Sequence, residues 1–322
     1  PLPPKATPTS TPPPSTATPT PPSSAVQLTG FGSVDFTIPH VTGDGAIDVQ
    51  DLGTDLKNVV IEARIFNPYP RSEGTWDAGF LFRNSGVGEF HAVIITIRGL
   101  WYHYVRDEGS GAGTLVQSQS SDQINLSPIG SNDLRVIALD DDGWLFINGV
   151  FVAILDLSGW RKAGTVKGAT GYFTGDAIAG KSTRFEDFTI SALPTQYGPL
   201  DGSLEHDPDS RTIKTHSSGV DLNNSVVEVR LFNPYPTSAG SWSSGVILRR
   251  SSLNTFHAIV LTSDQRWSHR LRSGTTASTV FQEETSQSIS VATGGSNHLR
   301  IIAMGEIGWL FINGEFIAQL AL

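Results

Sequence analysis

Gly143-Trp144-Leu145-Phe146-Ile147-Asn148-Gly149 returns 165 residues later (308 − 143) as Gly308-Trp309-Leu310-Phe311-Ile312-Asn313-Gly314. An apolar run that ends in Asn-Gly predicts a β-hairpin, because both residues tolerate the positive φ angles of a tight type I′ turn. The first copy leaves this turn through Val150-Phe151-Val152-Ala153, and the second through Glu315-Phe316-Ile317-Ala318. A hairpin that occurs twice predicts a tandem β protein.

The duplication extends well beyond the hairpin. Phe66-Asn67-Pro68-Tyr69-Pro70 returns as Phe232-Asn233-Pro234-Tyr235-Pro236, an offset of 166 residues (232 − 66). The offset is 165 at the hairpin, so one residue is lost in the variable loop around 107–130. We expect a duplicated core, because loops tolerate changes of length better than strands do.

The strand pattern predicts an antiparallel sheet. In 59–65 the apolar residues alternate with Glu62 and Arg64, which is typical of a strand with one face in the core and one in water. No segment has the pattern of a long helix. The fold class predicted is all-β, with two tandem antiparallel jelly-roll sandwiches preceded by an extended Pro/Thr-rich segment. Other strands expected in the first copy are 79–84, 89–97, 101–106, 133–139, 143–148, 150–155, 169–173 and 182–191.

The repeat divides the chain into three predicted segments. Residues 1–24 form a Pro/Thr/Ser-rich stalk or linker, 25–192 the first sandwich and 193–322 the second. The second copy contains no counterpart of residues 158–192, so we expect an open edge and an uncovered core. Either the natural chain continues beyond residue 322, or a neighbouring molecule donates an extended segment such as 25–38. Donation from head to tail would produce an open fibre of identical copies.

Composition restricts the function classes. A formal charge of −9 and a pI near 5.3 argue against a nucleic-acid partner, which requires a basic surface. The absence of cysteine excludes disulfides, thiolate nucleophiles and cysteine-ligated metals. No run approaches the roughly 18 apolar residues of a membrane span. The chain begins at Pro1 without a signal peptide, so we expect a processed or partial piece of a longer protein.

The stalk composition indicates an extracellular or cell-surface location. Proline-rich segments of this kind favour extended polyproline II and cannot bury a core. Their Thr and Ser residues beside prolines are typical acceptors of O-linked glycans. The alternative is an unmodified flexible linker.

A family resemblance rests on several motifs together. Phe90-His91-Ala92, the Trp144 hairpin, Gly171-Tyr172-Phe173-Thr174-Gly175-Asp176 and Phe185-Glu186-Asp187-Phe188-Thr189 resemble the concanavalin A-like lectin/glucanase superfamily. The similarity is greatest to laminin G-like modules that follow Pro/Thr-rich linkers in bacterial surface proteins. It covers most of residues 31–322. The resemblance implies a β-sandwich, in a superfamily that includes lectins, glycosidases and structural domains.

The acidic residues do not form a catalytic pattern. A glycosidase needs two opposed carboxylates, and glycosidases of this superfamily carry clustered acids on one strand. The acids present in both copies are scattered, and Arg64 on the same strand face is the expected ion-pair partner of Glu62. Asp140-Asp141-Asp142-Gly143 lacks the spaced ligands of a calcium loop and is better explained as a turn. We therefore expect no catalytic residues, no metal and no cofactor. The acids considered are Asp35, Asp201, Asp55, Asp221, Glu62, Glu228, Glu186 and Asp187.

Matched aromatic, histidine and arginine residues are the candidate carbohydrate site. Trp101-x-His103 and Trp267-x-His269 place an indole and an imidazole on one strand face, suited to stacking on a sugar ring and bonding its hydroxyls. The alternative is that the tryptophans are core anchors with histidines packed beside them. The candidates are Trp76, Arg83, His91, Trp101, His103, Trp242, Arg249, His257, Trp267 and His269.

These observations rank three candidate functions. The first is a non-catalytic extracellular structural or adhesive protein, a subunit of a surface fibre whose partners are copies of itself. The second is a carbohydrate-binding module that recognises polysaccharide. An enzyme acting on glycans ranks third, because paired acids are missing.

Overall fold

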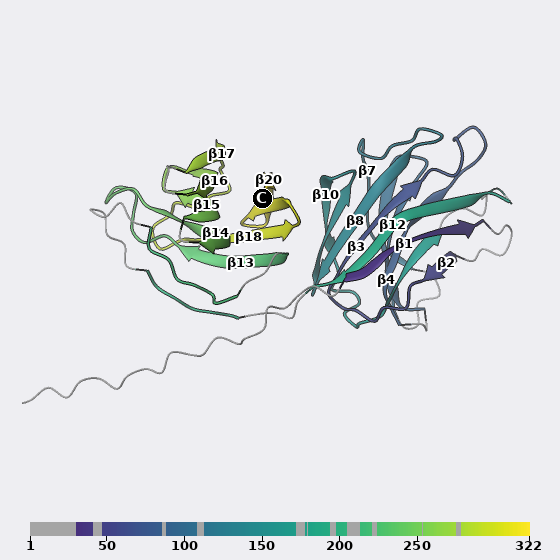
Figure 1. The fold of residues 1–322 in the computed structure, drawn as a ribbon, viewed down its shortest axis with the longest axis horizontal. Helices are drawn as coiled ribbons and strands as arrows, with labels where there is room; N and C mark the ends of the chain where they lie inside the picture. Colours follow the sequence, from purple (N-terminus) through teal and green to yellow (C-terminus); the bar gives the residue numbers. More distant parts are fainter. Residues whose placement is uncertain are drawn as a thin grey trace, which may run out of the picture. The chain divides into compact units, whose positions relative to one another are not determined.

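The computed structural model describes residues 30–40, 47–85, 88–107, 113–171, 178, 180–193, 198–204, 213–220, 224–252, 254–274 and 278–322. The expected stalk, 1–24, lies outside these residues. The chain divides into two compact units, one of residues 27–197 and one that contains 198–322. Within the described ranges the regular secondary structure is entirely β-strand, which confirms the all-β prediction (Figure 1). In the same ranges no helix has the length and apolarity of a membrane span.

The first unit is a sandwich of two six-stranded antiparallel sheets. One sheet has the order β1-β12-β3-β8-β9-β10, and the other has the order β2-β11-β4-β5-β6-β7. The strands are β1 (Gly30–Pro39), β2 (Asp48–Asp51), β3 (Val59–Phe66), β4 (Asp77–Asn84), β5 (Phe90–Thr96), β6 (Leu100–Arg106), β7 (Thr114–Ser120), β8 (Ser131–Leu139), β9 (Asp142–Ile147), β10 (Val150–Asp156), β11 (Thr165–Thr170) and β12 (Ser182–Ala192).

The core of the first unit lies between its sheets. Ile61 and Leu145 from one sheet pack in the same cluster as Phe80 and Val93 from the other, and all four are fully buried. Alternation along each strand places every second side chain in this layer, as the sequence pattern of β3 predicts. The antiparallel sandwich architecture is thus confirmed for this unit.

The second unit is a smaller sandwich of two four-stranded antiparallel sheets, β13-β18-β19-β20 and β14-β15-β16-β17. Its core packs Ile259 and Trp267 against Leu299 and Leu310. The strands are β13 (Ser225–Phe232), β14 (Ser243–Ser252), β15 (Thr255–Thr262), β16 (Arg266–Ser273), β17 (Thr279–Thr285), β18 (Ser296–Met304), β19 (Ile307–Ile312) and β20 (Glu315–Ala321).

The two units share strand order and register. The order β3-β8-β9-β10 has the same connectivity as β13-β18-β19-β20, and β4-β5-β6-β7 the same as β14-β15-β16-β17. Val59 pairs with Ala138 in the first unit, and Ser225 pairs with Ala303 in the second, at the offsets seen in the sequence. Among the described residues of the second unit, nothing corresponds to β1, β2, β11 or β12.

Both central hairpins have the predicted turn. Asn148 and Gly149 have φ angles of 52° and 80°, and Asn313 and Gly314 have 52° and 86°. Positive φ at both central residues defines the type I′ turn. The Asn148 side chain adds three hydrogen bonds. Its oxygen accepts from the Asp133 amide at 2.8 Å, and its nitrogen donates to the Gln123 carbonyl at 2.6 Å and to the Asn132 side-chain oxygen at 3.3 Å. The type I′ prediction is confirmed in both units.

Three strands were not expected from the sequence, namely β1, β2 and β7. β1 pairs with β12, so residues 30–39 belong to the first unit's own sheet and are not a free arm for donation. β7 lies inside the region expected to be a loop, 107–130, and pairs with β6. Its alternation is hidden because both of its faces are largely exposed at the sheet edge. The expected donor segment 25–38 is therefore engaged over its described part.

Candidate functional site

The tryptophans of the candidate carbohydrate site are core residues. Trp76 and Trp101 are 1% and 0% exposed, and Trp242 and Trp267 are 3% and 1% exposed. Stacking on a sugar needs an accessible ring face, so none of these indoles serves as a stacking platform. The shared parity of Trp101 and His103 is as predicted, but the face they share points into the sandwich. Burial of a large aromatic side chain stabilises the fold and explains why these positions match between the copies.

Arg83, His91 and His103 do form a cluster, and it is buried. All three side chains are 0% exposed. Arg83 Nη1 donates to the carbonyl of Trp160 at 3.1 Å, and His91 Nε2 lies 2.8 Å from the same oxygen. The indole Nε1 of Trp160 donates back to the Arg83 carbonyl at 2.9 Å. The loop between β10 and β11 thus closes over the cluster, with the Trp160 peptide as its polar contact.

The Arg83 guanidinium is held by main-chain carbonyls. Besides Trp160 it donates to Lys57 at 2.9 Å, to Asp140 at 2.6 Å and to Leu157 at 3.4 Å. Burial lowers the pKa of Arg83 to about 10, with nearby Asp140 acting in the opposite direction. The side chain joins the end of β4 to three other segments, so its geometry is that of a structural clamp.

Hydrogen bonding fixes the tautomers of the histidine pair. His91 Nε2 faces a carbonyl and must donate, so its Nδ1 accepts from His103 Nε2, which lies 3.0 Å away. His103 Nδ1 then carries only a lone pair, and this buried atom has no hydrogen-bond partner among the residues that the structure describes. Burial lowers the pKa of His91 to about 4 and that of His103 to about 3. Both imidazoles are neutral at pH 7, and neither is accessible to a ligand.

The second unit repeats this cluster in a more open form. His257 Nδ1 lies 2.9 Å from His269 Nε2, with ring centroids 5.2 Å apart, as they also are in the first unit. Arg249 has a φ angle of 51°, compared with 52° at Arg83. His269 is buried, whereas Arg249 and His257 are only half-buried. Burial lowers the pKa of His257, and that of His269 to about 4.

The acidic residues considered above have structural partners. Glu62 pairs with Arg135, its cross-strand neighbour, and Arg64 pairs with Asp133 at 3.0 Å, so the expected Glu62–Arg64 pair is wrong. Directly opposed residues on adjacent strands are closer than residues two apart on one strand. Glu228 pairs with Arg300 in the second unit in the same way.

The remaining acids are accounted for singly. Asp35 accepts from the Asp187 amide at 2.9 Å, Asp187 lies 3.5 Å from Arg64, and Glu186 lies 3.1 Å from Arg184. Asp55 and Asp201 are exposed. Asp221 lies outside the described residues.

Asp140 and Asp141 form the predicted turn between β8 and β9, whereas Asp142 and Gly143 begin β9. Asp140 has a φ angle of 48° and binds Lys57 at 2.8 Å. Asp141 forms a two-point pair with Arg161 at 2.6 and 2.8 Å. Within the described ranges no three His, Cys, Asp or Glu residues gather as a metal site would require.

The outward face of the sheet β2-β11-β4-β5-β6-β7 holds residues that the sequence analysis did not select. Because Trp101 and His103 point inward, Tyr102 and Tyr104 of β6 point outward. Their rings lie side by side, 6.0 Å between centroids at 29°, and both are half-buried. Tyr104 packs against an apolar cluster of Leu81, Phe90, Ala92, Ile94 and Ala169. The signal in the sequence that could have identified this pair was two aromatic residues at positions i and i+2 of one predicted strand.

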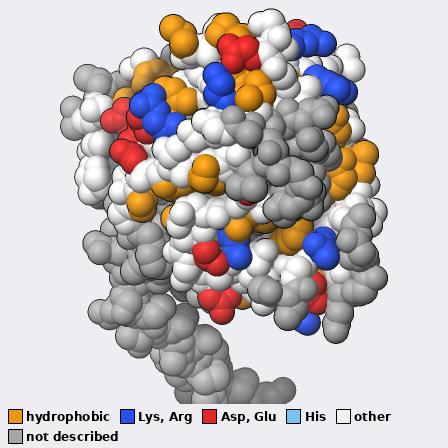
Figure 2. Space-filling model, turned by 90° about the vertical axis from the view of Figure 1, so that its right-hand side faces the viewer, with side chains coloured by type: hydrophobic (Ala, Val, Ile, Leu, Met, Phe, Trp, Pro, Cys, Tyr) orange, Lys and Arg blue, Asp and Glu red, His pale blue; other side chains and the backbone are white. Residues whose placement is uncertain are grey.

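Charged residues lie on the same sheet. Lys167 is on β11 opposite Leu81, and its ammonium is 3.1 Å from the Asp51 carboxylate on β2. The hydrogen bond from the Gly53 amide and the pair with Lys167 lower the pKa of Asp51, whereas burial opposes them. On the face of the molecule drawn in Figure 2, positive and negative side chains are interspersed among apolar ones. The described side chains on that face form no continuous basic surface.

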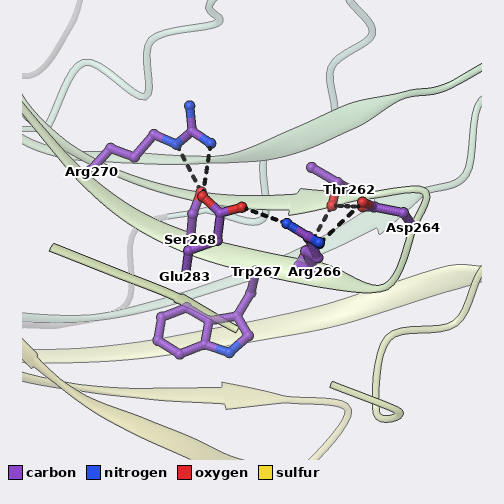
Figure 3. Close-up of a pocket in the computed structure, with 7 residues that line it drawn as sticks. All are labelled: Thr262, Asp264, Arg266, Trp267, Ser268, Arg270 and Glu283. Atoms are coloured by element: carbon purple, nitrogen blue, oxygen red, sulfur yellow. Dashed lines mark hydrogen bonds and ion pairs between the residues drawn. The ribbon is translucent and has the colours of Figure 1, made fainter. Parts of the chain in front are cut away.

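The corresponding face of the second unit is polar. Ser268 and Arg270 occupy the positions of Tyr102 and Tyr104, and they line a hollow with Arg266 and Glu283 (Figure 3). Arg266 lies 3.1 Å and Arg270 3.6 Å from the Glu283 carboxylate. The Trp267 ring turns to the opposite side of the strand, toward the other sheet (Figure 3). The aromatic pair is thus confined to the first unit.

Comparisons with known proteins give structural neighbours only. No protein-family model matches the chain, and no curated protein matches it. Among solved structures, the carbohydrate-binding module CBM66 from Bacillus subtilis is 9% identical with a TM-score of 0.36, covering 50% of this chain and 97% of that one. Sheep galectin-11 is 12% identical with a TM-score of 0.31, covering 42% and 95%. The laminarinase catalytic domain from Thermotoga maritima is 14% identical with a TM-score of 0.34, covering 49% and 76%. At these values no ligand or activity is transferred to this chain.

Proposed function

We propose that the protein binds carbohydrate, without hydrolysing it, through the outward face of the sheet β2-β11-β4-β5-β6-β7. The observation that supports this function is the pair of half-buried rings of Tyr102 and Tyr104, side by side on that face. Pyranose rings present apolar C–H faces that stack on aromatic rings. Lys167 and Asp51, on neighbouring strands of the sheet, are suited to hydroxyl groups at the rim.

The face also suits binding better than turnover. Asp51 is bound by a lysine and a main-chain amide, so its carboxylate is held as an acceptor rather than as an acid near neutral pH. Burial raises the pKa of Tyr104, and Tyr102 beside it acts in the same direction. Tyr104 therefore stays neutral at pH 7, and the two tyrosines together supply ring faces and hydroxyl groups. Glycosidase chemistry needs an acid and a second, opposed carboxylate.

A glycan array on the intact chain tests this function. We expect saturable binding of at least one polysaccharide. Tyr102→Ala and Tyr104→Ala should each weaken this binding about tenfold. Phe281→Ala is the matched control, because this ring is 44% exposed on β17 of the other unit. Reducing-end release is measured on the bound polysaccharide in parallel. Unchanged binding by the double tyrosine variant, or the appearance of new reducing ends, would contradict the proposal.

The structural alternative, a subunit of an extracellular fibre built from copies of this chain, has less support. Its expected donor, residues 25–38, is paired with β12 over its described part. The extracellular location and the O-linked glycans on 1–24 stay predictions as well. Electron microscopy and sedimentation of the intact chain test the fibre, and intact-mass measurement of the natural protein tests the glycans.

A further inference from the structure

The hollow on the outward face of the second unit is lined by charged residues that the first unit lacks (Figure 3). It has a volume of about 110 Å³ and lies over β16 beside the turn from β15. Trp101 and Trp267, the core residues of the two equivalent strands, are buried alike, so the fold does not require the charges. The register places Arg266, Arg270 and Glu283 at the positions of Leu100, Tyr104 and Ser118.

The two arginines of the hollow are held in place by neighbouring side chains. Arg266 Nη1 lies 3.1 Å from the Glu283 carboxylate, and its Nε lies 3.3 Å from the Asp264 carboxylate. Arg270 Nε donates to the Ser268 hydroxyl at 2.9 Å, and its Nη2 lies 3.6 Å from Glu283. A side chain that is already ordered loses less conformational entropy when a ligand binds. Both guanidinium groups are therefore prepared for a ligand.

The hydrogen-bonding groups left over in the hollow are donors. Each guanidinium has five N–H groups. Arg266 Nη2 and Arg270 Nη1 form no hydrogen bond with the residues that the structure describes, and the two side chains are 53% and 42% exposed. Both oxygens of Glu283, in contrast, already face an arginine. The hollow consequently suits a ligand that presents oxygen acceptors.

The local charge favours an acceptor that is negative. Arg272 follows Arg270 by two residues on β16 and so lies on the same strand face, which gives three arginines beside the two carboxylates of Asp264 and Glu283. The formal charge of the whole chain is −9, but charges farther away than about 8 Å are largely screened at physiological ionic strength. Guanidinium groups bind oxyanions such as carboxylates through two parallel N–H bonds.

We propose that the second unit binds the acidic groups of an anionic polysaccharide through Arg266 and Arg270. The inference rests on the proposed carbohydrate function and names its substrate class, a polymer that carries carboxylate or sulfate groups. Tyr102 and Tyr104 of the first unit contact sugar rings, and the arginines contact the acidic substituents. Glu283 and Asp264 position the arginines and do not themselves bind the polymer.

Titration calorimetry of the intact chain with two pairs of polymers tests the proposal. Polygalacturonate is compared with its methyl-esterified form, which keeps the sugar backbone and loses the charge. A sulfated galactan is compared with its desulfated form, so the two pairs distinguish carboxylate from sulfate. We expect at least one acidic polymer to bind about tenfold or more tightly than its neutral form. The Arg266→Gln, Arg270→Gln double variant should lose this preference.

Two further double variants separate the site from general electrostatics. Arg64→Gln with Arg161→Gln removes the same charge from two exposed ion pairs of the first unit and should leave the preference unchanged. Arg266→Lys with Arg270→Lys keeps the charge but loses the planar fork, so it should bind the acidic polymer at least about threefold more weakly. Near-UV circular dichroism verifies folding. Should the glutamine variant not fold, the lysine variant and the polymer pairs on the unaltered chain decide the result.

Three outcomes would overturn the inference. They are equal affinity for the acidic and neutral forms of both polymers, an equal loss of preference in the first-unit control, and full binding by the lysine variant. The proposed function fails differently, because it depends on the tyrosines. If the Tyr102→Ala, Tyr104→Ala double variant binds every polymer unchanged while the arginine variant loses the acidic preference, the first-unit face is wrong and the arginine site stands.

Discussion

At the residue scale, the backbone conformation of the Asn148-Gly149 turn determines which side chains the turn can accept. A Cβ added at Gly149 meets no atom within 4 Å, so space does not exclude a side chain there. The φ angle of 80° excludes a β-branched side chain, because such a residue is strained in that region. We predict that Gly149→Val lowers the free energy of unfolding by about 1–3 kcal/mol. Thermal denaturation measures the change.

The control for this turn is Gly149→Asn. Asparagine tolerates positive φ better than valine does, so it should cost less than half as much. Equal stability of the valine variant and the unaltered chain would contradict the account of the turn. The same pair of substitutions at Gly314, where φ is 86°, should give the same order.

The buried histidine pairs predict a pH dependence. Folding lowers the pKa of His103 to about 3 and that of His91 to about 4, both below the usual value of 6.5. The unfolded chain therefore takes up protons below about pH 6.5 that the folded chain does not, so stability is full above that pH and falls as the pH decreases toward 4. Melting temperature measured between pH 7.5 and 5 should fall progressively, a window in which most carboxylates stay ionised.

Nuclear magnetic resonance separates this effect from general acid unfolding. The imidazole signals of His91, His103 and His269 should not titrate between pH 7.5 and 5 in the folded chain. Titration of His103 near pH 6.5 would contradict the buried neutral pair.

At the element scale, the loop between β10 and β11 acts as a lid on the first unit's polar cluster. Trp160 is 8% exposed, and Lys162 lies over its ring at 4.7 Å. We predict that Trp160→Ala lowers the free energy of unfolding by about 3 kcal/mol or more, because it removes a large buried side chain over Arg83 and His91. Chemical denaturation of the intact chain measures this change.

The matched variant is Trp160→Phe. It keeps an aromatic ring but loses the indole hydrogen bond to the Arg83 carbonyl, so it should cost about 1 kcal/mol. If alanine and phenylalanine have the same effect, packing of the ring is not what holds the loop. The main-chain contact of Trp160 to His91 is present in both variants, which makes the comparison specific to the side chain.

The sequence predicted the strands that have strong alternation, such as β3, or a continuous apolar run, such as β5 and β9. β3, β5 and β9 were placed within a few residues because their alternation or their apolar run is strong. β1, β2 and β7 were missed because strands at or near a sheet edge have weak alternation, and what defines them is a partner distant in the chain. Likewise Glu62 was assigned to Arg64, since cross-strand neighbours cannot be identified before register is known.

The candidate site could be predicted only in part, because the direction in which its side chains point depends on the packing of the whole molecule. Parity correctly placed Trp101 and His103 together, but a duplicated sequence does not say which sheet face is the core. The inward direction becomes clear only once Trp101 packs in one cluster with Leu134 and Leu145 of the opposite sheet. Tyr102 and Tyr104, one residue away, then take the outward position. The buried cluster of Arg83, His91 and Trp160 joins segments 77 residues apart (160 − 83), which no local pattern predicts.

The unequal covering of the two units predicts unequal stability. Stabilisation by apolar burial is roughly 25 cal/mol per Å², and the second unit leaves Phe232, Val227 and Leu231 incompletely buried. Local opening should therefore be easier along β13 than along β3, whose neighbours lie on both sides. We expect hydrogen exchange of the intact chain to be at least about tenfold faster in 225–232 than in 59–66, and denaturant to unfold the second unit first. Core strand β18, which is paired on both sides, is the internal control and should exchange more slowly than β13. Equal protection of β13 and β3 would show that the edge of β13 is already covered in solution.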